Sequence, residues 1–210
     1  MTAEWLTAIG TLGTFGVIAA SAAAALIQLR HLRSSNQIAT ITQLRQYAAT
    51  PEFKNAQRLV LTQLNEKMED PEFRYQMAHP EARDAQTGEF IQDLIMYADY
   101  YETMGSLVKN GLLDKRMAID LFGFQITSAW RRLAFGTAIL RREVGSVLGE
   151  NLEYLVVLAQ DDVRAHPKGT YPRGVRRVEL PDIYLDADEK YEAIRDGLCE
   201  NHENLKHSKL

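Results

Sequence analysis

The pattern of hydrophobic and polar positions begins with a long apolar run. Residues 5–29, WLTAIGTLGTFGVIAASAAAALIQL, contain no charged side chain and no proline. As a helix that rises ~1.5 Å per residue, the run would extend ~37 Å, more than the ~30 Å hydrocarbon core of a bilayer. Backbone polar groups inside hydrocarbon must bond within their own segment, so a lone span has to be helical. The pattern therefore predicts a transmembrane helix within residues 1–29.

Three other interpretations of the run fit less well. A cleaved signal peptide starts with basic residues, whereas Glu4 is the only charged side chain ahead of the run, and the apolar pattern continues past the small residues at 21–25. A soluble core helix of this length rarely lacks a charge, and an interfacial helix would carry a basic face. The transmembrane helix is the first interpretation, and the signal peptide is the second.

The residues that flank the run predict its orientation. Arg30, His31 and Arg33 follow it directly, while Glu4 precedes it. Since positively charged flanks stay on the cytoplasmic side, we expect a single-pass protein of the cell inner membrane with residues 30–210 in the cytoplasm. Trp5 lies where an aromatic residue would contact the membrane interface.

Helical periodicity continues beyond the apolar run. Neither proline nor glycine occurs from residue 30 to Thr50, which predicts a helical stalk over residues 30–49. Thr50 followed by Pro51 is typical of a helix start, and Asn110 followed by Gly111 is typical of a helix end. Further helices are predicted over residues 52–66, 71–77, 86–109, 115–143 and 147–164. The fold class is thus all-α: one transmembrane helix continues into the stalk, and a cytoplasmic helical bundle follows over residues 50–165.

The last part of the chain has a different composition. Residues 166–210 begin with a proline- and glycine-bearing basic linker, continue as a predicted acidic helix over 186–204, and end in a short basic tail. Arg173, Arg176 and Arg177 in the linker could contact anionic lipid headgroups, each such charge being worth ~1 kcal/mol near the surface. A solvated linker and an RNA contact are the alternatives.

Charge and cysteine content narrow the function classes. The 210 residues have a net charge of −4, so we expect no nucleic-acid partner. The single cysteine, Cys199, excludes an internal disulfide framework and fits a reducing compartment.

A seven-residue repeat of small polar side chains marks one face of the apolar run. Thr7, Thr14, Ser21 and Gln28 share this face, and Gly10 lies close to it. Small and hydroxyl-bearing residues let membrane helices approach and bond across the contact. We therefore expect a parallel homo-oligomer with this face inward; a monomeric anchor is the alternative. Five or more chains could instead leave a water-filled pore on the axis, lined by the same side chains.

Four segments of the chain are similar to a known protein family. They are YYETMGSLVKNGLLD at 100–114, DLFGFQITSAW at 120–130, RRE at 141–143 and NLEYL at 151–155. These segments resemble an uncharacterised bacterial family that is described only as a domain of unknown function. The resemblance covers roughly residues 5–160. It implies an N-terminal membrane helix followed by a helical cytoplasmic region, and it implies no activity.

The best candidate for an internal site is Glu102. Its predicted helix face is aromatic, where an unpaired carboxylate would be costly, and Arg131 and Arg141 on the next helix are predicted partners in a buried ion pair. A carboxylate that titrates or binds a ligand is the functional alternative.

The sequence contains no strong motif for catalysis or metal binding. Cys199, His202 and His207 form a weak metal pattern without a fourth ligand, and hydrolase or phosphate-loop motifs are absent. We expect no catalytic residue, no metal and no cofactor. The sequence predicts a non-enzymatic, membrane-anchored oligomer whose helical domain serves as an interaction or scaffold module, in contact with membrane lipids and a protein partner; the alternative function is a homo-oligomeric channel.

Overall fold

The structure is a computed structural model that describes residues 3–192, 194 and 195, and within residues 4–10 it describes the backbone alone. The chain divides into two compact units, residues 1–170 and residues 171–210. In the first unit the helices are α1 (Ala3–Ala48), α2 (Pro51–Lys67), α3 (Pro71–Ala78), the short 3-10 helix η1 (Pro80–Ala82), α4 (Ala85–Lys109), α5 (Lys115–Val144) and α6 (Glu150–Ala165). The predicted all-α fold is confirmed.

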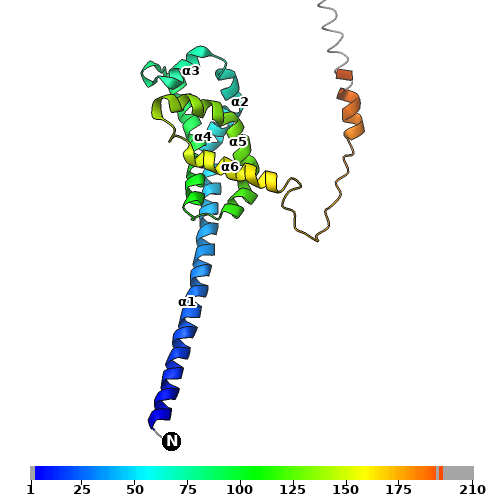
Figure 1. The fold of residues 1–210 in the computed structure, drawn as a ribbon. Coiled ribbons are helices and arrows are strands. Elements are labelled where there is room, and N and C mark those ends of the chain that lie inside the picture. The colour runs from blue at the N-terminus through cyan, green and yellow to red at the C-terminus, as the bar shows by residue number, and fades with distance from the viewer. Residues whose placement is uncertain (1–2, 193, 196–210) are drawn as a thin grey trace, which may run out of the picture. The chain divides into compact units, whose positions relative to one another are not determined.

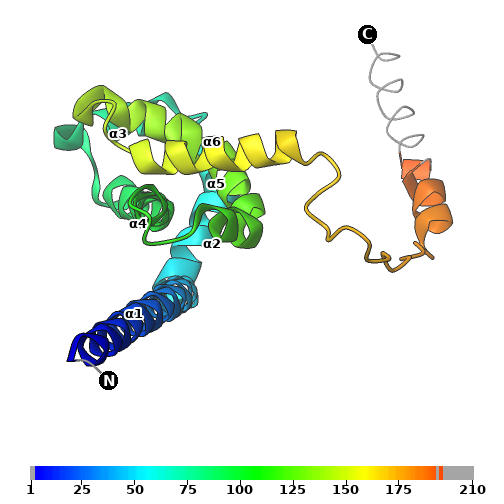
Figure 2. The ribbon, with the colours of Figure 1, turned by 60° about the horizontal axis from the view of Figure 1, so that its bottom comes forward.

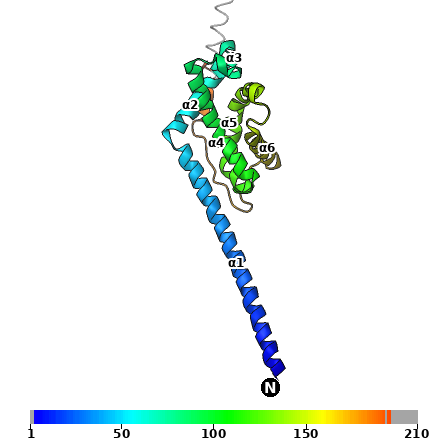
Figure 3. The same ribbon diagram turned by 90° about the vertical axis from the view of Figure 1, so that its left-hand side faces the viewer.

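The first helix, α1, is a single rod that projects from the bundle (Figure 1). Its 46 residues correspond to ~69 Å of helix, and the same projection is visible from the side (Figure 3). The prediction that the apolar run continues into a helical stalk without a break is confirmed. Within its described side chains, the most apolar stretch of α1 is long enough to cross a membrane, and none of that stretch is buried.

The turn after α1 has the predicted chemistry. The Phe53 amide donates to the Thr50 hydroxyl oxygen at 3.3 Å, and this hydroxyl in turn donates to the Tyr47 carbonyl at 2.8 Å. Pro51, at the first helical position, lacks the N–H that would have no partner there. The rod therefore ends at a capped junction, and the chain restarts as α2.

The bundle is organised around α4, which packs against α2, α5 and α6. Figure 2 shows α4 nearly end-on, with α6 crossing past it. The core is built from apolar and aromatic side chains on the inward faces of these helices. Among them are Phe53, Val60, Leu64, Phe90, Leu94, Tyr97, Tyr101, Met104, Phe122, Ile126, Leu133, Leu152 and Leu155.

Contact between α1 and this bundle is confined to the last turns of α1. Leu44 is buried, Ile41 and Ala48 are partly buried, and Ile38 is 60% exposed. The rod is therefore fixed to the bundle by a short apolar seam.

One predicted helix start was wrong. The predicted helix over 147–164 begins three residues later, at Glu150. Gly145 and Gly149 adopt positive φ angles of 90° and 72°, a conformation that side chains with a Cβ rarely take. Between them the chain forms a turn in which the Leu148 amide donates to the Gly145 carbonyl. The helix can begin only after Gly149, because that glycine has left-handed geometry.

The second unit is described by itself. Its described residues form turns at 173–174 and 183–184, without regular secondary structure between them, and then a helix over 185–195, with residue 193 outside the described set. The Arg177 guanidinium lies 4.9 Å from the centre of the Tyr171 ring, and the Tyr171 hydroxyl donates to the Arg176 carbonyl at 3.3 Å. The end of the predicted acidic helix lies outside the described residues.

Candidate functional site

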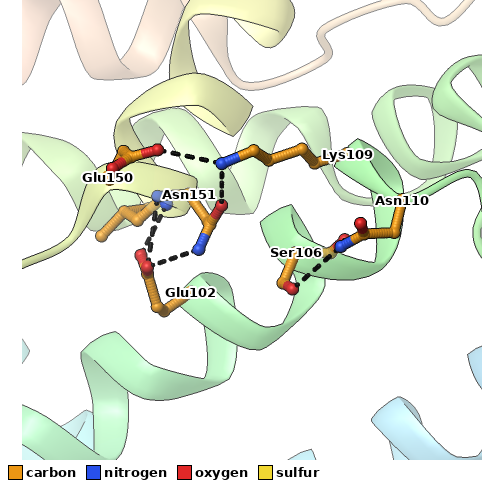
Figure 4. A network of polar contacts seen from close by, with 7 residues as sticks. Glu102, Ser106, Lys109, Asn110, Glu150 and Asn151 are labelled. Atoms are coloured by element: carbon orange, nitrogen blue, oxygen red, sulfur yellow. Dashed lines mark hydrogen bonds and ion pairs between the residues drawn. The ribbon is translucent and has the colours of Figure 1, made fainter. Parts of the chain in front are cut away.

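The most developed polar site joins α4 to the start of α6 (Figure 4). Glu102 reaches from α4 to the first turn of α6, where both its carboxylate oxygens are used. One oxygen accepts from the Asn151 backbone amide at 3.2 Å and from the Asn151 side-chain amide at 2.8 Å. The other accepts from the Leu152 amide at 2.8 Å. Glu102 therefore caps a helix that follows it by almost fifty positions.

This cap replaces one that α6 lacks. The residue at the N-cap of α6 is Gly149, which has no side chain to accept from the first amides. Unpaired amides at a helix N-terminus need an acceptor, and the helix dipole favours a negative one. Glu102 supplies both the acceptor and the charge.

An ion pair strengthens the same junction. The Lys109 ammonium donates to Glu150 at 2.9 Å and to the Asn151 side-chain oxygen at 3.3 Å. The hydrogen bond and the charge of Lys109 lower the pKa of Glu150, and the same bond raises the pKa of Lys109. Both side chains are about half exposed, so solvent and salt screen their attraction.

The two helices also meet at very close range. A Cβ added at Gly105 would lie 2.6 Å from the carbonyl carbon of Asn151 and even closer to its oxygen. Only glycine permits this approach, which brings Glu102, one turn earlier on α4, within reach of the α6 amides.

The prediction that Glu102 pairs with Arg131 or Arg141 was wrong. No ion pair joins them in the part of the chain that the structure describes. Arg141 donates to Glu153 at 2.7 Å and to the Leu148 carbonyl at 2.8 Å, and Arg131 is exposed on α5. The first backbone amides of α6 lie nearer to Glu102 than either guanidinium does, and they supply hydrogen-bond donors to its carboxylate.

A cavity of about 80 Å³ lies beside Glu102, with Leu94, Leu133, Leu140 and Leu152 among its lining. Pockets that hold a small molecule usually measure ~300–1,000 Å³. The cavity is smaller than such pockets, and both carboxylate oxygens of Glu102 already accept hydrogen bonds from α6, so the arrangement is a structural joint between the two helices.

The predicted oligomer face lies along α1. Thr14, Ser21 and Gln28 are exposed, while the side chains of Thr7 and Gly10 lie outside the described residues. The spacing of seven continues into the stalk at Ser35 and Thr42, which sequence reasoning missed although the repeat was there to extend. Both are exposed, and they lie on the side of the helix opposite to the buried Leu44.

The remaining candidates lie in the last part of the chain. Arg173, Arg176 and Arg177 belong to the second unit, and their predicted lipid contact stays a prediction. Cys199, His202 and His207 lie outside the described residues. Among the residues that are described, no group of His, Cys, Asp and Glu side chains could hold a metal ion.

Comparison with known proteins places the chain in a family. Neither the curated proteins nor the solved structures contain a match to it. The matching family model, described as "Domain of unknown function (DUF4760)", covers residues 15–157, from within the apolar run to the middle of α6. The match spans well over half of the chain, which therefore belongs to the DUF4760 family.

Proposed function

We propose that this protein is a membrane-anchored helical module, with α1 as its single transmembrane span. The observation that carries the proposal is the exposed apolar surface of α1. Four of its large side chains, Leu12, Phe15, Ile18 and Leu26, are 60–72% exposed, along a helix that projects from the bundle. Such a surface is unfavourable in water, and a bilayer would cover all of it.

The charges that flank the apolar stretch favour one orientation in the membrane. Arg30, His31 and Arg33 follow the apolar stretch, and they favour an inner-membrane protein with the bundle in the cytoplasm. The well-packed bundle and its saturated polar joint support a role in presenting a surface to other molecules. The proposed activity is non-enzymatic: an interaction or scaffold module held at the membrane.

Self-association along α1 is the second part of the proposal. The small polar face of Thr14, Ser21 and Gln28 can pack against copies of itself. The face continues through Ser35 and Thr42, on the side of the stalk that points away from the bundle. The bundle therefore does not obstruct the α1 helix of a second chain on this face. A channel with these side chains around its axis is the alternative arrangement, favoured by the hydroxyl and amide groups of the same face.

Membrane insertion is tested by alkaline extraction of membranes that contain the full chain. We expect the protein to stay in the pellet. Ala19→Arg with Ala23→Arg should release it, since each arginine near the helix centre costs ~2.5–3.5 kcal/mol. Ser34→Arg with Ile38→Arg is the matched control, with the same charges and spacing outside the apolar run. Release of the unmodified chain would refute the anchor.

Orientation and assembly need two further measurements. Orientation is measured by labelling Cys199, the only cysteine, with a maleimide that does not cross membranes. If the bundle is cytoplasmic, Cys199 should react only after the inner membrane is permeabilised. Subunit counting in nanodiscs should give more than one chain, and Thr14→Leu should reduce that number. Ion conductance that Thr14→Leu abolishes would favour the channel over the scaffold, and a single chain per nanodisc would refute self-association.

A further inference from the structure

The turn between α4 and α5 lies at the end of the bundle from which α1 projects, as two views show (Figures 1 and 3). At this turn the Leu112 side chain is 60% exposed, while the neighbouring Leu113 is buried. Lys115 and Arg116, the first residues of α5, are both exposed. An exposed leucine beside cations is typical of surfaces that contact lipid headgroups.

The two cations of this turn are not engaged by acidic side chains among the described residues. In the part of the chain that the structure describes, neither Lys115 nor Arg116 forms an ion pair, and the nearby Asp114 carboxylate accepts from the Met117 amide as the cap of α5. Positive side chains at a helix N-terminus oppose the helix dipole. Lys109 differs, because it is engaged by Glu150. The charges of Lys115 and Arg116 are therefore available to an anionic partner.

The position of the turn relative to α1 identifies that partner. The Arg45 guanidinium lies 6.0 Å from the centre of the Phe122 ring, which sets α5 level with α1 at this point. α5 runs away from this turn in the same sense as α1 runs into the bundle. Lys115 precedes Phe122 by about two turns, or ~10 Å, so Lys115 is roughly level with α1 near residue 38. From there to Arg30, at the end of the apolar run, is ~12 Å along the helix. Headgroups extend ~5–8 Å beyond the hydrocarbon, and long basic side chains cover much of the remaining gap.

We propose that this turn, residues 110–116, is a second membrane contact, in which Lys115 and Arg116 bind anionic phospholipid headgroups and Leu112 enters the interface. The inference rests on the proposed membrane insertion of α1. It assigns lipid recognition to a surface that the basic linker at 173–177 does not include. It also fixes the tilt of the bundle, because α1 and the turn would contact the membrane at two separate points.

The test is hydrogen–deuterium exchange of the full chain in nanodiscs of phosphatidylcholine alone and with about a quarter phosphatidylglycerol. We expect amides 111–117 to exchange more slowly in the anionic discs, by up to roughly 30-fold, since each of two cations strengthens the contact about fivefold. About 0.5 M NaCl should remove the difference, because it shortens the Debye length to about 4 Å. Lys115→Gln with Arg116→Gln should remove it as well.

A matched control removes two exposed charges elsewhere. Lys54→Gln with Arg131→Gln changes the net charge equally, away from this end of the bundle, and should keep the lipid-dependent slowing. Unchanged protection of amides 94–104 verifies that each variant is folded. Equal exchange at 111–117 in both lipids, or slowing that survives in the Lys115 and Arg116 variant, would overturn the proposal. Failure of the chain to enter nanodiscs at all would refute the membrane anchor instead, so the two failures are distinct.

Discussion

Gly105 of α4 lies directly against the backbone carbonyl of Asn151 in α6. A Cβ on Gly105 would lie 2.6 Å from the carbonyl carbon, too close for any other residue to fit without moving a helix. The same approach lets Glu102 accept from the Asn151 and Leu152 amides. Gly105 and Glu102 therefore act together to join α4 to α6. The glycine allows the close approach, and the carboxylate one turn earlier binds the amides that the approach brings near.

Gly105→Ala should destabilise the bundle by about 2 kcal/mol or more, since overpacking against rigid backbone typically costs about 1–3 kcal/mol. Gly88→Ala, in the same helix, is the matched control. A Cβ at Gly88 meets nothing within 4 Å, so this variant should gain about 0.5–1 kcal/mol from helix propensity. Urea unfolding in mild detergent measures both. Equal effects of the two substitutions would show that the close approach is unimportant.

Glu102→Gln should cost about 1–2 kcal/mol in the free energy of unfolding, because the neutral amide turns a donor toward the α6 amides and loses the favourable charge at the helix start. Exchange of the Asn151 and Leu152 amides should become faster. Glu89→Gln, an exposed position on the same helix, should leave both quantities unchanged. An unaltered exchange rate at Leu152 in Glu102→Gln would contradict the capping role.

The Lys109–Glu150 pair should make stability depend on pH at both extremes. The pKa of Glu150 is lowered from its ordinary 4.5, so its contribution is present above that pH and is lost as the pH falls. The pKa of Lys109 is raised from 10.5, so its contribution is present below that pH and is lost as the pH rises further. The pair should therefore stabilise the fold from about pH 5 to about pH 10.

A double-mutant cycle with Lys109→Met and Glu150→Gln, measured by urea unfolding, checks this dependence. The coupling between the two sites should be present at pH ~7 and should weaken as the pH falls below the ordinary pKa of Glu150. It should also shrink in high salt, because the pair is exposed. Coupling that depends on neither pH nor salt would show that packing, rather than charge, links these side chains.

Leu44→Ala should loosen the seam between α1 and the bundle. Leu44 is 7% exposed, and deletion of a buried leucine side chain typically costs about 2–5 kcal/mol; the lower end is expected here because the seam is short. Ile38→Ala serves as the control, since Ile38 is 60% exposed. Protease cleavage near residues 49–50 should rise in Leu44→Ala alone. Cleavage that rises equally in both variants would rule out the seam as the element that holds the rod.

Local signals in the sequence were sufficient for most of the helix boundaries. Thr50 and Pro51 define one helix start, Asp114 caps another, and Asn110 with Gly111 ends α4, because each signal acts within a few residues of its own backbone. The exception is the start of α6. There the decisive feature is the left-handed geometry of Gly149, and a glycine in the sequence does not reveal the sign of its φ angle.

Hydrophobic spacing and capping residues are properties of neighbouring positions, so they were enough to predict the long apolar rod and the helical bundle. The tertiary structure alone decided which groups meet across the bundle. Charge favoured Arg131 and Arg141 as partners of Glu102, whereas the folded chain brings it the free amides of α6. The position of the Leu112 turn beside the rod was likewise hidden in the sequence, because it depends on how α4 and α5 pack against the end of α1.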